Sequence, residues 1–220
     1  MTVDLYFSPY ACSMVVRIVA DAAGVALGLR EVDLYTKRCT GDGADYLAVN
    51  PRGQVPVLVL DDGDHLVEVG AITQYLVARS PGSGLMGGSE RERFRTLEGL
   101  SFAATEVHKR ILFPLGALAT PPAARAHARD SAPTVLADLA RALGSRPFYA
   151  GDQFTVADAY LAWAFIIART FRLELSPIED YAARLAAVPS VARAIAAETP
   201  LALASWRRQR DGLGQAPWLR

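Results

Sequence analysis

The sequence predicts an α/β domain followed by an all-helical domain. Strands and helices alternate over residues 1–80, whereas nearly everything after residue 89 is rich in alanine and has helical periodicity. The stretches Ser80-Pro-Gly-Ser-Gly84 and Gly87-Gly-Ser89 between these regions are rich in residues that interrupt helices and strands, so we place the boundary there. A chain of 220 residues is long enough for two domains, 1–80 and 89–220.

The first domain begins with a strand at residues 3–7, a helix that ends near Gly24, a strand at 29–33 and a short helix around 44–49. Residues 57–60 and 65–67 follow, and the turn sequence between them predicts a hairpin. A closing helix is expected at 71–79. This order, βαβα followed by ββα, is that of a thioredoxin-like domain.

The second domain is predicted to hold a long helix, 90–113, and four more helices at 123–143, 156–171, 178–187 and 190–198. Thr155 and Asp158 form a capping-box pattern at the start of the third of these helices, which we interpret as structural. Residues 201–220 form a predicted tail. Its Trp206 and Trp218 either cover a cleft or pack on the surface.

Composition excludes several classes of function. Lys plus Arg and Asp plus Glu number 23 each, so neither nucleic acid nor an anionic membrane is an expected partner. The two cysteines have neither CxxC nor zinc-type spacing, so no metal is expected, and a reducing cytoplasm is the simplest location. The N-terminus has no signal-type region, and the longest apolar run, 159–168, is too short to span a bilayer. A cytoplasmic enzyme acting on small molecules fits best.

Cys12 is the most informative single residue. It lies between the first strand and the first helix, where free amide N–H groups and the helix dipole favour a thiolate, either on Cys12 itself or on a bound thiol ligand. The alternative is that Cys12 is a small, inert, buried residue.

Five segments together resemble the glutathione S-transferases, and in particular their bacterial beta class. The resemblance covers nearly the whole chain. The segments that carry it are Ser8-Pro-Tyr-Ala-Cys-Ser13, Asp45-Tyr-Leu-Ala-Val-Asn-Pro-Arg-Gly-Gln-Val-Pro-Val57, Glu68 with Ala71-Ile-Thr-Gln-Tyr75, Ala104-Thr-Glu-Val-His-Lys109, and Phe154-Thr-Val-Ala-Asp-Ala-Tyr160.

The resemblance implies that glutathione is the co-substrate and that residues of both domains bind it. Pro56 is expected to be cis, with the backbone of Val55 pairing with the cysteinyl part of glutathione. Glu68 and the backbone N–H of Val69 are expected at the γ-glutamyl end. The remaining implied glutathione-binding residues are Cys12, Lys37, Ser101, Thr105, Glu106, His108 and Lys109.

Cys12, His108 and Ser13 are the predicted catalytic residues. His108 is expected near the sulfur, on one helical face with Ser101 and Thr105. Phe7 stands where many relatives carry a tyrosine and cannot donate a hydrogen bond to a thiolate, so Ser13 is the nearest substitute donor. The electrophile pocket is expected to include Tyr10, Leu112 and Phe113, with no motif to identify the substrate.

The predicted function is therefore detoxification: glutathione is transferred to small hydrophobic electrophiles by a cytoplasmic, metal-free homodimer. Two alternatives stay open. In one, Cys12 itself carries out thiol/disulfide exchange with glutathione, which would require a second thiol for release. In the other, the protein binds hydrophobic ligands in the cleft between the domains without catalysis.

Overall fold

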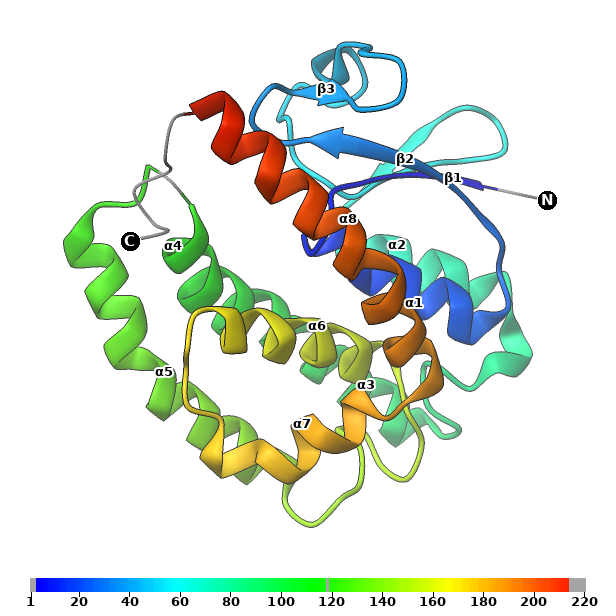
Figure 1. The fold of residues 1–220 in the computed structure, drawn as a ribbon. Helices are drawn as coiled ribbons and strands as arrows, with labels where there is room; N and C mark the ends of the chain where they lie inside the picture. The colour runs from blue at the N-terminus through cyan, green and yellow to red at the C-terminus, as the bar shows by residue number, and fades with distance from the viewer. Residues whose placement is uncertain (1–2, 118, 214–220) are drawn as a thin grey trace.

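The computed structural model describes residues 3–117 and 119–213 (Figure 1). An α/β part and a helical part pack against each other, as the sequence predicts. Residues 214–220, and with them Trp218, lie outside the described residues. The division into domains at residues 80 and 89 stays a prediction.

The α/β part is built on one mixed sheet with the strand order β3-β2-β1-β4-β5. The central strand β1 is parallel to β2 and antiparallel to β4, while β3 and β5 add antiparallel edges. The strands are β1 Val3–Phe7, β2 Leu27–Asp33, β3 Arg38–Cys39, β4 Val57–Val59 and β5 His65–Val67. This confirms the thioredoxin-like order and adds β3, which is too short to give a sequence signal.

Two helices, α1 (Ser13–Ala23) and α2 (Val69–Ala78), pack against each other on the side of the sheet that faces the helical part (Figure 1). Helix α1 ends where predicted because Gly24 adopts a left-handed φ of 69° and its N–H bonds back to carbonyls of the last turn. The short helix expected around 44–49 is a 3₁₀ turn, η1, at Tyr46–Ala48.

Alternation along β1 decides which side chains reach the main core. Val3, Leu5 and Phe7 are buried in it, whereas Tyr6 points to a smaller cluster on the other side, with its ring 5.5 Å from that of Tyr46. The first face of the strand is therefore the one that meets α1.

The helical part consists of successive helices joined by short turns. Its elements are α3 Glu90–Phe102, η3 Ala103–Leu112, α4 Phe113–Gly116, α5 Pro122–Leu143, α6 Val156–Thr170, α7 Glu179–Ala186 and α8 Pro189–Leu213, with 3₁₀ turns η2 at Pro81–Ser83 and η4 at Ser176–Ile178. Helix α6 contacts α3, η3 and α7 within this part and α1 of the other, so it is the central helix of the molecule.

The predicted helix 90–113 is continuous, but its middle is wound differently. Residues Ala103–Leu112 form a π-helix, in which each N–H bonds five residues back, as the N–H of Phe113 does to His108. Since π-turns are frequent at functional sites and this one carries His108 and Lys109, its winding sets the directions of side chains that the sequence predicts to be functional.

The last helix is longer than predicted. The sequence predicts a helix at 190–198, but α8 continues to Leu213. It passes through Pro200, although proline lacks the N–H that a helix interior uses. Ala202 and Ser205, beyond the proline, are buried, so packing after the proline stabilises the continued helix. Most of the predicted tail is thus the second half of α8, which runs beside α1 and toward β2 in Figure 1.

The start of α6 is held by a buried carboxylate. Asp158, fully buried, accepts hydrogen bonds from the backbone N–H and hydroxyl of Thr155, the N–H of Tyr149 and the hydroxyl of Tyr181. The predicted capping box is present.

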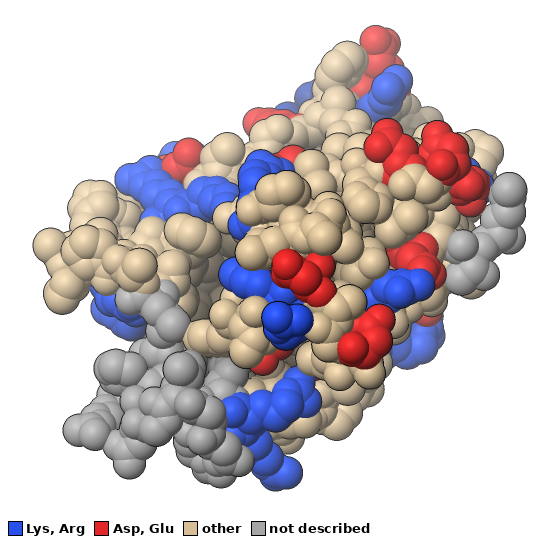
Figure 2. All heavy atoms as spheres, turned by 90° about the horizontal axis from the view of Figure 1, so that it is seen from above, with Lys and Arg blue, Asp and Glu red and all other residues tan. Residues whose placement is uncertain are grey.

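The molecular surface carries both signs of charge. On the face seen in Figure 2, Lys and Arg lie beside Asp and Glu, in keeping with a net charge of zero. Within the described ranges no helix combines the length and apolar character required to cross a membrane.

Candidate active site

Cys12 caps the N-terminus of α1 and is half-buried. Its Sγ lies 3.4 Å from the carbonyl oxygen of Val55, to which the thiol can donate. Burial raises the pKa of Cys12 to about 12, although the charge of Lys109 and the N–H groups of Cys12 and Ser13 lower it. The expectation of a thiolate on Cys12 itself is therefore wrong for the ligand-free protein: the helix end acts in the predicted direction, but desolvation outweighs it.

Ser13 cannot serve as the expected thiolate donor. Its side chain is fully buried, and its hydroxyl donates to the carbonyl of Ser8 while accepting the N–H of the same residue, both at 3.2 Å. A hydroxyl has a single proton to donate, and here it is used to close the loop before α1. This corrects the prediction: Ser13 shapes the loop that positions Cys12.

Val55 and Lys37 lie just before the strands β4 and β3, respectively. The Val55–Pro56 peptide bond is cis, as expected. Lys37 adopts a positive φ of 57°, and its Nζ donates to the carbonyl of Gly53 at 2.8 Å. Lys37 is therefore close to the loop that carries Val55, and its contact with a ligand carboxylate stays a prediction.

Glu68 and Val69 lie at the start of α2. Glu68 has a left-handed φ of 70°, is largely exposed and pairs with Arg52 at 3.1 Å. Val69 is buried, so its backbone N–H at the helix N-terminus is the group it can offer to a ligand. Arg52 is an unpredicted neighbour of this corner, and it partly neutralises the carboxylate.

The π-helix presents its residues to different surroundings. Thr105 is exposed and donates back to the carbonyl of Ser101, and Glu106 pairs with Arg110 at 2.9 Å. His108 instead packs against α6, where its Nδ1 lies 2.9 Å from the hydroxyl of Tyr160. Ser101, Thr105 and His108 were expected on one helical face, but their surroundings differ: Ser101 and Thr105 are exposed, whereas His108 packs against α6.

His108 is neutral near pH 7. Burial, together with the positive charge of Lys109, lowers its pKa to about 4. Its ring also meets that of Trp163 edge-on, with centroids 4.7 Å apart. A histidine held in this way can donate or accept a hydrogen bond through its second nitrogen but does not readily hold an extra proton.

Electrostatic effects connect these residues into one site. Lys109 and Glu68 both act on the pKa of Cys12, and Cys12 and Glu68 both act on that of Tyr160. Helix α1 contacts both α2 and α6, and α6 contacts η3, so the elements that carry these residues lie side by side. His108 joins the group through its hydrogen bond to Tyr160.

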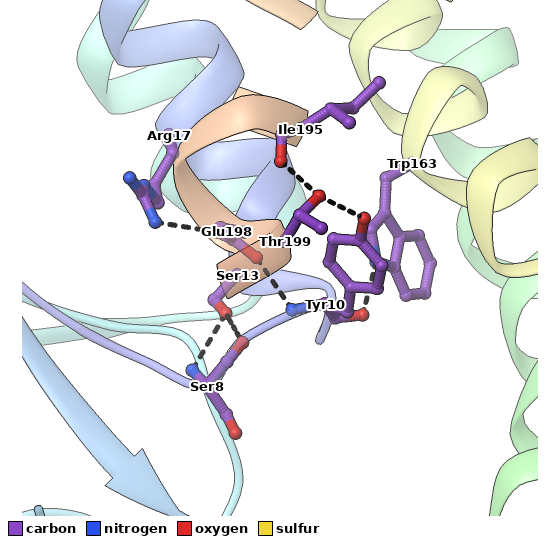
Figure 3. A network of polar contacts seen from close by, with 8 residues as sticks. All are labelled: Ser8, Tyr10, Ser13, Arg17, Trp163, Ile195, Glu198 and Thr199. Carbon is purple, nitrogen blue, oxygen red and sulfur yellow. Dashed lines mark hydrogen bonds and ion pairs between the residues drawn. The ribbon is translucent and has the colours of Figure 1, made fainter. Parts of the chain in front are cut away.

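Tyr10 is fixed between α6 and α8 (Figure 3). It has a left-handed φ of 60°, its N–H donates to Glu198 at 2.7 Å, and its carbonyl accepts the indole N–H of Trp163 at 3.0 Å. Its hydroxyl bonds Thr199, and its ring meets Trp206 edge-on at 6.2 Å. Tyr10 and Trp206 therefore form one aromatic unit beside the loop that leads to Cys12.

The other two predicted pocket residues differ from each other. Phe113 is 46% exposed, with the ammonium of Lys109 4.6 Å from its ring centroid, so it is available to an apolar ligand. Leu112 is 3% exposed and lines a small internal cavity between η3, α5 and α6. The geometry makes Leu112 a core residue, contrary to its predicted place in the electrophile pocket.

Several residues at the site were missed from the sequence. Tyr160 and Trp163 lie three residues apart in an apolar helix, which is the usual pattern of a core face, and Glu198 is a lone carboxylate among alanines. Their place at the site can be recognised only from their tertiary contacts. As for metals, the described ranges hold no group of three His, Cys, Asp or Glu side chains that could bind one.

The structure joins a thioredoxin-like sheet to a helical part, with a cysteine at a helix N-terminus and a neutral histidine on the adjoining helices. This is the architecture of a thiol-handling enzyme. Residues 3–84 match the family described as "Glutathione S-transferase, N-terminal domain", and residues 122–198 match "Glutathione S-transferase, C-terminal domain".

Individual relatives agree with the family match. Glutathione S-transferase GstA of Escherichia coli O157:H7 is 38% identical over 198 residues, which cover 88% of this chain and 98% of the relative. A sphingomonad glutathione S-transferase complexed with glutathione is 38% identical with a TM-score of 0.80, and the bacterial beta class enzyme of Sphingomonas chungbukensis is 34% identical with a TM-score of 0.81. Each alignment covers 89% of this chain and 98% of the solved structure. The chain belongs to the glutathione S-transferase family.

Proposed function

We propose that this protein conjugates glutathione to small hydrophobic electrophiles, as a member of the beta class. The observation that carries the proposal is the placement of Cys12, at the N-terminus of α1, 3.4 Å from the carbonyl oxygen of Val55. The neutral His108 supports it through Tyr160, because Tyr160 bonds His108 and lies on α6, which contacts α1. Free amides at the helix end and the nearby ammonium of Lys109 favour a negative sulfur on a ligand, even though Cys12 itself stays protonated.

The chemistry requires a thiolate and an electrophilic carbon. The glutathione thiol releases its proton to solvent, the sulfur electron pair forms a bond to carbon, and a leaving group departs with the electron pair of the bond that breaks. A thiol with an ordinary pKa of about 8.5 is only a few per cent ionised at neutral pH, so lowering that pKa by about two units gives most of the available thiolate. The protein supplies this shift and the orientation of the two reactants.

The residues proposed to bind glutathione come from both parts. Val55 is proposed to offer its backbone to the cysteinyl part of glutathione, and Glu68 and the Val69 N–H to bind the γ-glutamyl end. Lys37 is proposed to bind the glycine carboxylate of glutathione. From the π-helix region the proposed contacts are Ser101, Thr105, Glu106, His108 and Lys109, with Cys12 beside the sulfur. No metal takes part in this scheme.

The electrophile is proposed to lie against Tyr10, Trp206 and Phe113. These aromatic side chains are half-buried or exposed, whereas Leu112, next to Phe113 in the sequence, is buried. The aromatic surroundings favour a flat apolar substrate.

The first experiment is a calorimetric titration of glutathione, and in parallel of S-hexylglutathione, followed by conjugation assays with a panel of aromatic electrophiles. Saturable binding of both ligands and turnover of at least one electrophile are expected. Absence of binding of either ligand would contradict the proposal, and binding without any turnover would favour a ligand-binding role instead.

The exchange route through Cys12 has less support. A thiol whose pKa is about 12 forms little thiolate at neutral pH and attacks disulfides slowly. A stable mixed disulfide of Cys12 after incubation with oxidised glutathione, detected by mass spectrometry, would favour that route.

We further propose a cytoplasmic homodimer. Phe94 on α3 and Leu47 in η1 are 61% and 42% exposed, and large apolar side chains of this kind suit a subunit interface. Both cysteines are free thiols, in keeping with a reducing compartment. Sedimentation equilibrium of the wild type and a Phe94→Glu variant tests the dimer, and a monomeric wild type would contradict it.

A further inference from the structure

We propose that Tyr160 is a positioning residue that holds His108 in one tautomer, with the proton on Nε2, so that His108 acts as a hydrogen-bond donor to the ligand sulfur and not as the base that removes its proton. The tautomer stands on the structure alone, whereas the contact with sulfur rests on the proposed function.

The tautomer follows from the proton of the Tyr160 hydroxyl. Tyr160 is 3% exposed, and among the described residues its hydroxyl has one hydrogen-bond partner, Nδ1 of His108 at 2.9 Å. If Nδ1 carried a proton and donated it, the hydroxyl oxygen would accept and its own proton would be buried without an acceptor. If Nδ1 is unprotonated, the hydroxyl donates to it and both groups are satisfied. The second arrangement puts the imidazole proton on Nε2.

The second nitrogen, Nε2, is not fully buried. Among the described residues, the buried side-chain nitrogen and oxygen atoms without a partner are the hydroxyls of Ser83 and Ser190, so Nε2 of His108 is not a buried orphan. The imidazole ring of His108 cannot rotate freely, because Tyr160 bonds its Nδ1 and the Trp163 ring packs against it with centroids 4.7 Å apart. An accessible N–H on a fixed ring is a preorganised donor.

The charges around His108 favour its role as a neutral hydrogen-bond donor and disfavour its role as a base. Lys109 on the same π-helix disfavours a second proton on His108, as does burial, and together they lower its pKa to about 4. The other charged or titratable groups around the site are Cys12, which stays protonated, and Glu68, which is largely exposed and paired with Arg52. The thiol proton therefore leaves to solvent, and the Nε2–H hydrogen bond stabilises the negative sulfur that remains.

Nitrogen-15 NMR of histidine-labelled protein tests the tautomer directly. The chain has three histidines, His65, His108 and His127, so the signals of His108 can be assigned by their loss in His108→Gln. We expect a protonated Nε2 and an unprotonated, hydrogen-bonded Nδ1 at pH 7 in the wild type. A protonated Nδ1 would overturn the proposal.

Two variants separate a positioning role from general packing. Tyr160→Phe removes the hydroxyl, and the two nitrogen shifts of His108 are expected to move toward each other as the second tautomer gains population. Tyr181→Phe is the matched control, since it also removes a buried tyrosine hydroxyl, one bonded to Asp158, and should leave both shifts unchanged. Unchanged shifts in Tyr160→Phe would overturn the proposal.

The sulfur contact is measured separately, on protein shown by titration to bind glutathione. The apparent pKa of bound glutathione is measured from the thiolate absorbance, or from the pH profile of kcat/KM for the electrophile at saturating glutathione. It is expected to rise by up to about one unit in Tyr160→Phe and not in Tyr181→Phe. An unchanged value would overturn the donor role. If the wild type binds no glutathione, the proposed function fails while the NMR result still decides the tautomer, so the two failures are distinguishable.

Discussion

At the scale of single residues, the reactivity of Cys12 follows from what surrounds it. The thiol is half-buried, donates to Val55 and has its pKa raised to about 12 by burial. We expect Cys12 in the ligand-free protein to react with iodoacetamide at pH 7.5 more than tenfold more slowly than free cysteine, because the thiolate is the reacting form. Cys39→Ala, which leaves Cys12 as the single cysteine, is the variant to use, with mass spectrometry as the readout. Alkylation as fast as that of free cysteine would contradict the buried, protonated state.

Glu198 gives the stability a pH dependence of its own. Burial raises its pKa from 4.5 to about 7, although the Tyr10 N–H and the Arg17 guanidinium lower it. Between these values the folded chain binds more protons at this group than the unfolded chain does, so its contribution to the free energy of unfolding decreases as pH rises from 4.5 to 7. The slope is at most about 1.4 kcal/mol per pH unit.

Glu198→Gln cannot titrate and should lack this decrease. The measurement is urea unfolding of both proteins at several pH values from 5 to 8. His108, whose pKa is lowered, contributes a slope of opposite sign below pH 6.5, but both proteins contain it, so it cancels in the difference. Parallel stability curves would show that Glu198 is ionised throughout this range.

Residue identities and spacings predicted the elements on which Cys12, Val55, Glu68 and His108 lie. They did not predict the hydrogen-bond partners or the pKa shifts of these residues. The helix N-terminus at Cys12 could be predicted from the sequence, whereas the desolvation that opposes ionisation of its thiol depends on how the folded chain buries it. Ser13 was misjudged because its partner, Ser8, is reached only through the detailed path of the loop. The contacts of Tyr160 and Glu198 likewise depend on tertiary packing.

At the scale of elements, the start of α6 is expected to be far more sensitive to substitution than the start of α3. Both have capping boxes, Thr155–Asp158 and Ser89–Glu92, but Asp158 is fully buried and satisfies donors from three other residues. Asp158→Ala leaves those donors unpaired and should cost about 3 kcal/mol or more. Ser89→Ala, at an exposed helix start, should cost about 1 kcal/mol.

Chemical denaturation of the two variants beside the wild type makes the comparison. Equal losses of stability would show that the buried network around Asp158 contributes no more than an ordinary helix cap. A large loss confined to Asp158→Ala is the expected result, and it would identify α6 as the helix on which the packing of the helical part depends.

Most elements could be predicted because their local signals agree with the fold. The alternation of apolar residues in Val3–Phe7 and the glycine after α1 are local signals. The first correctly predicted a strand, and the second correctly predicted the end of a helix. The π-helix and the passage of α8 through Pro200 could not be predicted. Residue types do not distinguish π from α winding, and the packing that carries α8 past a proline comes from distant parts of the chain.

At the scale of the whole molecule, α8 joins the two parts through ion pairs, and among the described side chains these are Arg17–Glu198, Arg193–Asp21 and Arg208–Glu31. The first is almost completely buried, whereas Arg193 and Asp21 are exposed. Removing Glu198 leaves the Arg17 guanidinium without its carboxylate and the Tyr10 N–H without its acceptor. Glu198→Ala should therefore lower the free energy of unfolding by about 3 kcal/mol. Asp21→Asn should leave the denaturation midpoint nearly unchanged.

The two variants are also expected to differ in function. Glu198→Ala frees the backbone of Tyr10 and should weaken glutathione binding, measured by calorimetry, while Asp21→Asn should bind as the wild type does. If both variants bind normally, the attachment of Tyr10 to α8 has no part in shaping the site.

The attachment of Tyr10 to α8 also constrains the order of events during synthesis on the ribosome. The partners that fix Tyr10 follow it by 188 and 189 residues, so they are translated long after the loop that contains Tyr10. The sheet can form early, since domains tend to fold as they emerge, but the loop before Cys12 acquires its final path only when α8 arrives. A nascent chain therefore carries an unfinished site until its last helix has left the exit tunnel, and a stalled fragment would hold the sheet without the activity.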